Sequence, residues 1–197
     1  YFLDYEPKIK DKEDAVSAPT ECADIDLENV SFRYEGAKDD TLHDISLHIG
    51  AGERIALVGQ NGSGKTTLVK LLLRLYDPTE GSVKLDGKDI RDYTLDSYRD
   101  GYACVFQDFK MFSMSVGDNV LLRKAEEGDD KLVDYAIRES GAYDRVSRLD
   151  HGVDTTLTRE FDDKGANLSV GEQQKIALAR AFARKSPIII LDEPSSA

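Results

Sequence analysis

The sequence predicts an α/β fold: a core with a mixed central sheet, an N-terminal antiparallel β subdomain and an inserted α-helical subdomain. Three observations lead to this prediction. Apolar and polar residues alternate within residues 25–49, as in strands with one buried face. A glycine-rich loop separates an apolar run from a helical pattern within residues 55–76. Residues 188–191 (IIIL) form a short β-branched run, which is typical of a central parallel strand.

Length and composition point to an ordinary globular chain. Its 197 residues are enough for one large domain with a buried core, and 40% of them are hydrophobic and 32% charged. The formal net charge of −12 disfavours nonspecific nucleic-acid binding, because phosphate backbones attract basic surfaces. We therefore expect no nucleic-acid partner.

The two cysteines and the hydropathy of the chain indicate its compartment. Cys22 and Cys104 have neither metal-ligand spacing nor a disulfide framework, and Cys104 lies in a strand-like run that predicts a buried thiol. No stretch approaches the roughly 18 apolar residues of a membrane span, and no signal peptide is visible. We expect a reducing cytoplasm, and we interpret the ends at Tyr1 and Ala197 as those of a piece of a longer polypeptide.

The N-terminal elements follow in order. Residues 1–23 are charged and show no sustained period, which predicts a linker. Strand alternation begins at Ile25 and continues to Tyr34, with a change of phase at residues 28–29 that predicts a β-bulge. Alternation returns over residues 45–49 and predicts a second strand.

The central stretch is GQNGSGKT, residues 59–66, which fits the phosphate-binding pattern G-x-x-x-x-G-K-[ST]. The apolar run at residues 55–58 predicts a buried strand before it, and residues 67–76 predict a helix whose N-terminus points at the anion. Lys65 would reach the β- and γ-phosphates, and the Thr66 hydroxyl would ligate Mg²⁺. The residues predicted to surround the nucleotide here are Gly59, Asn61, Gly62, Ser63, Gly64, Lys65, Thr66 and Thr67.

Further elements follow the loop. Residues 83–85 predict a short strand ended by a hairpin turn at residues 86–87, and residues 102–106 predict a buried strand that ends at Gln107. Strand-like runs vanish between residues 115 and 167. There, a helical stripe over residues 132–137 has Asp129 or Asp130 as a candidate N-cap and Gly141 as a stop signal.

Two polar stretches carry further chemistry. The acidic pair Asp192 and Glu193 ends a predicted core strand, where ligands collect in such folds. Asp192 would hold Mg²⁺ and Glu193 would deprotonate the attacking water; a solvated strand end is the alternative. Ser169, followed three residues later by Glu172, predicts a capping box that opens a helix through Arg184.

In this order, GQNGSGKT, Gln107, LSVGE and IIILDE resemble the nucleotide-binding domain of an ABC transporter of the exporter type, over roughly residues 24–197. The signature motif L-S-G-G-Q of that family corresponds to LSVGE, with Val170 for a glycine and Glu172 for the glutamine. The resemblance implies that Ser169 and Gly171 contact the γ-phosphate across a dimer interface.

The resemblance also implies roles for the other candidate residues. Tyr34 would stack on adenine, although an ordinary strand aromatic is the alternative reading. Gln107 would touch Mg²⁺ and the attacking water. The implied catalytic residues are Glu193, Gln107 and Lys65, and the implied metal ligands are Thr66, Gln107 and Asp192.

The resemblance implies a domain organisation and partners. The expected parts are a linker from a membrane domain at residues 1–23, the β subdomain and P-loop core at 24–114, the helical subdomain at 115–167, and the signature helix with the Walker B strand at 168–197. The expected partners are ATP, a second nucleotide-binding domain, as a homodimer or heterodimer, and the coupling helices of a transmembrane domain. Those helices would face residues 108–116, whose apolar side chains we expect to be partly packed and partly exposed.

The function expected is ATP hydrolysis, with Mg²⁺, that powers transport on the cytoplasmic side of a cell membrane, in a piece that is itself soluble. The chain stops before the D-loop aspartate and the switch histidine of the family, so we expect weak or no hydrolysis by this piece alone. The alternatives are a soluble ABC-type ATPase of translation or DNA repair, and a regulatory module that binds ATP without turnover. A small-molecule kinase is disfavoured by LSVGE together with Gln107.

Overall fold

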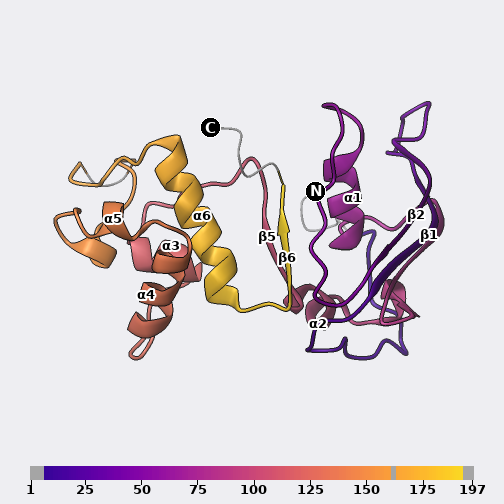
Figure 1. Ribbon diagram of the computed structural model, residues 1–197, viewed down its shortest axis with the longest axis horizontal. Helices are drawn as coiled ribbons and strands as arrows, with labels where there is room; N and C mark the ends of the chain where they lie inside the picture. The colour runs from indigo at the N-terminus through magenta and orange to yellow at the C-terminus, as the bar shows by residue number, and fades with distance from the viewer. Residues whose placement is uncertain (1–6, 161–162, 193–197) are drawn as a thin grey trace. The chain divides into compact units, whose positions relative to one another are not determined.

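The computed structural model describes residues 7–160 and 163–192, and the chain divides into two units, Tyr1–Tyr102 and Ala103–Ala197 (Figure 1). Glu193, the predicted base, lies outside the described residues. Each unit has its own sheet and its own helices. No helix within the described ranges is long and apolar enough to cross a membrane.

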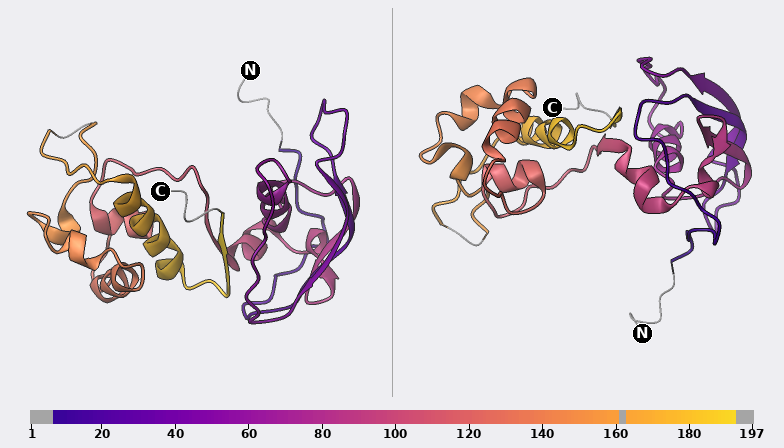
Figure 2. Two further views of the ribbon diagram at one scale, coloured as in Figure 1. Left: turned by 45° about the horizontal axis from the view of Figure 1, so that its top comes forward. Right: turned by 90° about the horizontal axis from the view of Figure 1, so that it is seen from below.

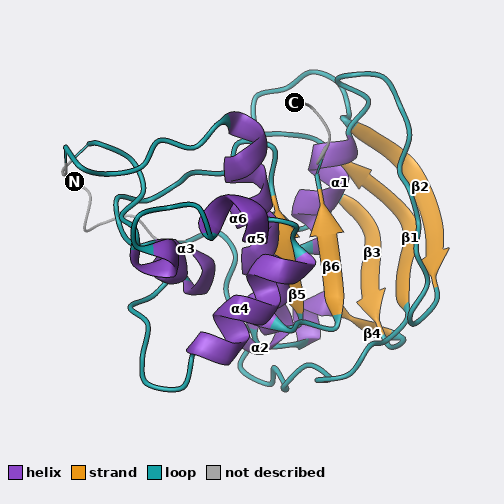
Figure 3. Cartoon of the chain, turned by 60° about the vertical axis from the view of Figure 1, so that its left-hand side comes forward, coloured by secondary structure: helices purple, strands orange, loops and turns teal. Residues whose placement is uncertain are grey.

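Unit 1 is built on an antiparallel sheet with the strand order β2-β1-β3-β4 (Figure 3). The strands are β1 (Ile25–Phe32), β2 (Leu42–Ile49), β3 (Glu80–Leu85) and β4 (Lys88–Asp89). The predicted bulge is present: the pairing of β1 with β2 shifts register between Leu27 and Val30, and Asn29 has a φ of 48°. The predicted hairpin joins β3 to β4 through Asp86 and Gly87, both at positive φ, as a tight primed turn requires.

Helix α1 (Lys65–Leu72) lies beside this sheet (Figures 1 and 3) and buries its apolar face in the core of unit 1. The helix was predicted to reach residue 76 but ends four residues earlier. Arg74 has a left-handed φ of 47°, and its buried guanidinium donates to the carbonyl oxygens of Ile90 and Tyr93. These bonds to η1 (Ile90–Asp92) and the residue after it hold the chain away from helical geometry. The sequence next to Arg74 does not predict them, because their acceptors lie far along the chain.

The strand predicted at residues 55–58 is wrong for this structure. These residues form no strand, and all four are exposed, with Val58 95% accessible. A strand needs a neighbour to accept and donate its backbone hydrogen bonds, and none of the described strands of unit 1 pairs with this run. Apolar composition alone therefore does not bury the segment.

The segment predicted to be a linker contacts unit 1 over much of its described length. The backbone of Val16 exchanges hydrogen bonds with Asp92 and Thr94, which flank Tyr93. The Asp11 carboxylate accepts from Leu95 N–H at 2.8 Å, at the start of α2 (Leu95–Asp100). The described part of this segment is therefore fixed to η1 and α2.

Unit 2 is mainly helical, and α6 (Val170–Arg184) is its central element (Figure 2). The other elements are β5 (Tyr102–Val105), α3 (Val116–Leu121), α4 (Asp130–Glu139), α5 (Tyr143–Val146), η2 (Gly152–Asp154) and β6 (Ile188–Leu191). One face of α6, with Ile176 and Ala179, enters an apolar cluster with α3, α4 and α5. Another face, with Ala177 and Ala181, packs on β5. The predicted helical insertion is thus present.

The strand predicted at residues 188–191 forms, but it is not buried as expected. β6 pairs with β5, and Asp192 N–H donates to the Val105 carbonyl at 2.9 Å. Ile189 and Leu191 are 46% and 43% exposed, and no described strand of unit 2 pairs with the other edge of β6. A run that reads as a central strand is therefore half-exposed here.

Candidate nucleotide-binding site

The glycine-rich loop of unit 1 leads directly into α1. Ser63 N–H donates to the Gln60 carbonyl at 3.1 Å, which closes a turn inside the loop. Gly64 is the N-cap of α1, with a left-handed φ of 92°. A Cβ there would lie 2.7 Å from Leu42 Cδ2 and 3.0 Å from the Thr41 carbonyl oxygen. Only glycine fits this position without displacing its neighbours.

The N-terminus of α1 is built to receive an anion. No side chain caps the helix, and its first turn has no acidic residue. The first backbone N–H groups of a helix lack internal partners and carry a partial positive charge, so they bind phosphate oxygens well. The Lys65 ammonium donates to the carbonyls of Gly59 (2.9 Å) and Gln60 (3.2 Å), which holds it across the loop. The arrangement suits a polyphosphate.

Two threonines follow Lys65 and have different surroundings. Thr66 is exposed at the start of α1. Thr67 is buried, and its hydroxyl lies 3.1 Å from the Tyr34 hydroxyl. The Tyr34 ring is held edge-on between Phe32 and Tyr76, with centroid distances of 4.8 and 5.4 Å. The structure thus brings Tyr34, the predicted adenine contact, to the first turn of α1.

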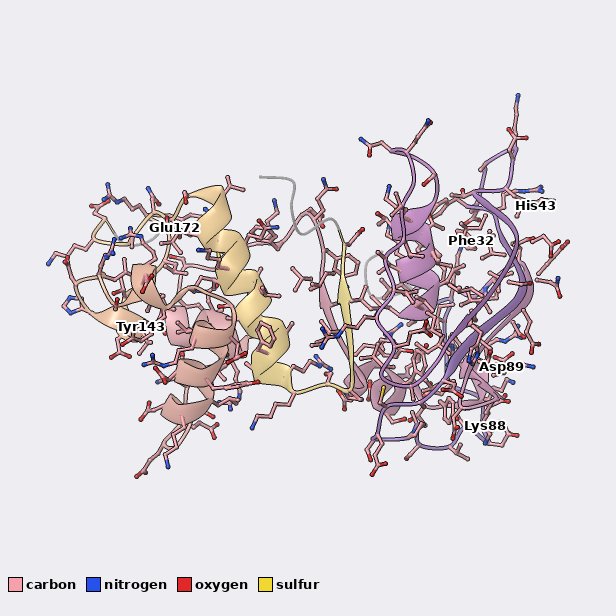
Figure 4. The ribbon with its side chains drawn as sticks, in the orientation of Figure 1. Phe32, His43, Lys88, Asp89, Tyr143 and Glu172 are labelled. Carbon is pink, nitrogen blue, oxygen red and sulfur yellow. The ribbon has the colours of Figure 1, made fainter. Side chains whose placement is uncertain are left out.

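The predicted signature residues open α6 with a complete capping box. Ser169 N–H donates to Glu172 Oε2 at 2.8 Å, and Glu172 N–H donates to Ser169 Oγ at 3.4 Å. This confirms the predicted cap and the predicted helix bounds. Figure 4 shows Glu172 at the N-terminal end of α6. A pocket of about 540 Å³ lies beside it, lined by Ser169, Gly171, Glu172, Gln174 and Lys175 among others.

Gln107 and Asp192, both expected to be Mg²⁺ ligands, lie at the same end of the β5–β6 pair. Gln107 is exposed two residues after β5, and Asp192 is 7% exposed directly after β6. The hydrogen bond between Asp192 N–H and the Val105 carbonyl fixes the two strand ends together. Cys104 is only half-buried, and burial together with the Asp192 charge raises the pKa of its thiol to about 12.

The candidate residues therefore fall into two groups. Tyr34 and residues 59–67 belong to unit 1, whereas Gln107, Ser169, Gly171 and Asp192 belong to unit 2. In unit 1 the residues gather around the start of α1, whereas in unit 2 Gln107 and Asp192 follow β5 and β6, and Ser169 and Gly171 lie at the start of α6. Among the described residues, no group of three or more histidine, cysteine or acidic side chains forms a metal cluster. Any metal site here must also use hydroxyl or amide oxygens.

The structure also reveals a polar hub that the sequence analysis missed. Asn119 is fully buried, and its amide nitrogen donates to the carbonyls of Phe112, Met114 and Ser115. Arg180, on α6, donates to the Asn119 side chain at 3.0 Å and its backbone carbonyl at 2.9 Å. The hub ties the segment after Gln107 to the signature helix. The only signal in the sequence was that this asparagine stands between two apolar residues, Val116 and Val120, which the structure shows to be buried.

The segment after Gln107 has the mixed character expected of it. Phe112 is 48% exposed, whereas Phe109 and Met111 are partly buried and pack against the apolar cluster that β5 and α6 share. The Phe112 N–H donates to Asn119 Oδ1 at 3.0 Å, and the Arg180 guanidinium lies 5.6 Å from the centroid of the Phe112 ring.

Arg145, on α5, is a second residue that sequence reasoning missed. Its Nε lies 2.9 Å from Glu172 Oε1, an ion pair in which the N–H is not aligned for a hydrogen bond. The pKa of Glu172 is held below its ordinary value, first by the Ser169 N–H and further by the charges of Arg145 and Lys175. The carboxylate is therefore charged at neutral pH.

Comparison with known proteins places this geometry in a family. Residues 42–196 match the family model described as ABC transporter. The chain is 41% identical over 174 residues to the ATP-dependent lipid A-core flippases of Yersinia pestis and Salmonella typhimurium; the match covers 88% of this chain and 29% of each relative. The chain thus spans less than a third of those relatives.

A solved structure gives the same result. A bacterial Atm1-family ABC exporter with ATP bound matches the whole chain and 34% of its own length, at a TM-score of 0.89 and 33% identity. The α/β fold class predicted from the sequence is confirmed, and so is the resemblance from which the function was inferred. The chain belongs to the ABC transporter family and is an ATP-binding domain of that family.

Proposed function

We propose that this chain is the ATP-hydrolysing domain of an exporter. Two such domains would bind two ATP molecules between them and drive the conformational change of a transmembrane partner. The observation that carries the proposal is the start of α1, where an uncapped helix and the Lys65 ammonium converge on one loop. That arrangement gives a triphosphate both hydrogen-bond donors and positive charge.

The residues present suit Mg²⁺ as well as ATP. Thr66, Gln107 and Asp192 offer hydroxyl, amide and carboxylate oxygens, which are the hard ligands that Mg²⁺ prefers. The metal, when bound, would neutralise charge that develops on the transferred phosphoryl group. Glu193, beside Asp192 in the sequence, would act as general base toward the attacking water. Tyr34 would offer its ring to the adenine base.

Two surfaces of unit 2 would meet partners. Ser169 and Gly171, at the start of α6, would contact the γ-phosphate of the ATP held by a second domain. Phe112, exposed above the Asn119 hub, would contact the coupling helix of a transmembrane domain on the cytoplasmic side of the membrane. The flippase and exporter relatives favour this function over a soluble ATPase of translation or DNA repair. We also propose that the chain is organised in the four parts expected from its sequence, of which residues 1–23 are the linker to a membrane domain.

The test is ATP-driven dimerisation of a Glu193→Gln variant, followed by analytical ultracentrifugation with Mg-ATP and with Mg-ADP. The substitution removes the proposed base and keeps its shape, so a dimer that forms with ATP and is lost with ADP supports the sandwich. Because this piece alone is expected to hydrolyse ATP weakly or not at all, phosphate release is measured on the full-length protein that contains it, and there it separates an ATPase from a non-hydrolysing module. A chain that binds no ATP would contradict the proposal.

A further inference from the structure

We infer that Arg145 and Glu172 form a charge pair that sets how strongly the Ser169 face binds the ATP of a second domain. This inference rests on the proposed ATP sandwich. It assigns Arg145 as a positioning residue, which acts on the nucleotide only through its contact with Glu172. The pair lies beside the pocket lined by Ser169, Gly171 and Lys175.

The first step concerns the single proton of the Ser169 hydroxyl. Ser169 Oγ lies 3.0 Å from Glu172 Oε2 and can donate to it. A hydroxyl has only one proton, so a Ser169 that donates to Glu172 can only accept on its other side. A phosphate oxygen has no proton to offer at neutral pH in ATP. To donate to the γ-phosphate, Ser169 must therefore turn its proton away from Glu172 and give up that hydrogen bond.

The second step concerns charge. The Glu172 carboxylate stabilises the positive N-terminus of α6, but it is also a negative charge at the place where another anion would approach. Like charges at short range repel by an amount that depends on how well each is compensated. Glu172 Oε1 is compensated by Arg145 Nε at 2.9 Å, and the two side chains are 30% and 36% exposed. The pair is thus partly shielded from water.

The third step concerns how Arg145 is held. Its backbone N–H donates to the Ala142 carbonyl at 3.1 Å, within the first turn of α5. Ala142 and Val146, on either side, are buried in the apolar cluster that also contains Ile176 of α6. The backbone of Arg145 is therefore fixed relative to α6. A flexible surface arginine would compensate Glu172 less consistently, because ordering its side chain costs entropy.

These steps predict opposite effects for the two partners. Glu172→Gln keeps an oxygen that can accept from Ser169 N–H and removes the negative charge, so the ATP-bound dimer should tighten. Arg145→Ala leaves Glu172 with less compensation, from Lys175 alone of the two cations that act on it, so the dimer should weaken. Each change should alter the dimer dissociation constant by about three- to ten-fold, the range expected for one partly exposed charge.

The experiment is a double-mutant cycle in the Glu193→Gln chain, with dimer dissociation constants measured by analytical ultracentrifugation in Mg-ATP. Arg145→Ala should weaken the dimer when Glu172 is present and change it less than two-fold in the Glu172→Gln background. Arg148→Ala and Glu139→Gln, exposed charge removals on the neighbouring helical segments, are the matched controls and should leave the constant unchanged. ATP affinity, measured at protein concentrations too low for dimers, should stay constant in every variant.

The outcomes are separable. Equal weakening by Arg145→Ala in both backgrounds would show a merely structural role and overturn the inference. Weakening by Glu172→Gln would also overturn it, because the carboxylate would then assist assembly. An ATP-dependent dimer that no variant of the pair alters would reject the inference and leave the sandwich standing. The absence of any ATP-dependent dimer, in the parent and in all variants, would reject the proposed function and the inference with it.

Discussion

Helices α1 and α6 both begin at a predicted phosphate contact, yet their N-termini are built in opposite ways. The N-cap of α1 is Gly64, which has no side chain, and its first turn has no acidic residue. The N-cap of α6 is Ser169, and the third residue of that helix is Glu172, which completes a capping box. At the corresponding position of α1, Thr67 turns its hydroxyl toward Tyr34 instead.

The difference indicates two ways of using a helix N-terminus. The N-cap residue of α1 makes no side-chain cap hydrogen bond, and a bound anion that accepts from the first turn would stabilise unit 1 by mass action. The N-terminus of α6 already holds the carboxylate of Glu172, so its geometry is fixed without a ligand. We infer that α1 provides binding strength, whereas α6 presents a preformed hydroxyl that a second domain completes.

The largest expected effect tests the need for glycine at the α1 cap. Gly64→Ala combines a left-handed φ with a Cβ that would meet Leu42 and the Thr41 carbonyl, so it should destabilise α1 by about 3 kcal/mol. Gly62→Ala is the matched control, because Gly62 also has a positive φ, of 82°, but no atom lies within 4 Å of its Cβ. It should cost only about 1–2 kcal/mol. Hydrogen–deuterium exchange of the α1 amides measures both, and equal losses would contradict the packing argument.

The local elements could be predicted from the sequence because their causes are local. The β1 bulge, the turn at residues 86–87 and the Ser169 capping box each depend on residues a few positions apart. Burial of the runs at 55–58 and 188–191 depends instead on which distant elements cover their side chains, and sequence period carries no information on that. Both runs were predicted to be buried, and both are exposed or half-exposed.

The candidate site divides in the same way. Lys65 and Thr66 were found from the motif because a phosphate loop needs those residue types at that spacing. Arg145 and Arg180 were missed because their partners, Glu172 and Asn119, lie 27 and 61 positions away in the chain. A charged residue with a distant partner has no periodic or spacing signal. Only the tertiary structure identifies such a pair.

The second prediction tests the binding strength assigned to α1. Lys65→Ala removes the ammonium that crosses the loop at Gly59 and Gln60, so ATP affinity should fall by about 2–3 kcal/mol, or roughly 100-fold. Lys38→Ala, on an exposed turn of the same unit, should leave it unchanged. Titration calorimetry with Mg-ATP measures both. An unaltered affinity in Lys65→Ala would place the triphosphate elsewhere.

The third prediction tests the self-sufficiency of the α6 cap. Ser169→Ala removes the acceptor for Glu172 N–H, so the first turn of α6 should lose about 1 kcal/mol of stability without any nucleotide present. Hydrogen–deuterium exchange should show the loss in α6 and none in α1. Ser147→Ala, whose hydroxyl bonds only within α5 among the contacts that the structure shows, is the control. If protection of the α6 amides instead requires ATP, the capping box does not hold this helix start by itself, and the contrast drawn with α1 is wrong.

The smallest expected effect is a pH dependence that only α6 should show. The Ser169 N–H holds the pKa of Glu172 below its ordinary value of 4.5, so the folded state favours the charged form. A carboxyl group whose pKa is lowered in the folded state adds stability at pH values above its unfolded pKa. This contribution is lost as the pH falls below about 4.5 and through the folded pKa.

The charge at the α6 N-terminus should contribute about 0.5 kcal/mol to the free energy of unfolding, because the side chain is partly exposed and solvent screens it. Urea denaturation of the unsubstituted chain and of Glu172→Gln, compared between pH 6 and pH 3, should show a difference at pH 6 that becomes smaller as the pH falls toward 3. A change within the first turn of α1, which has no acidic residue to titrate, should show no such difference. If the difference in the free energy of unfolding between the two chains is as large at pH 3 as at pH 6, Glu172 stabilises α6 by its shape rather than by its charge. The contrast between the two helix starts would then rest on hydrogen bonding alone.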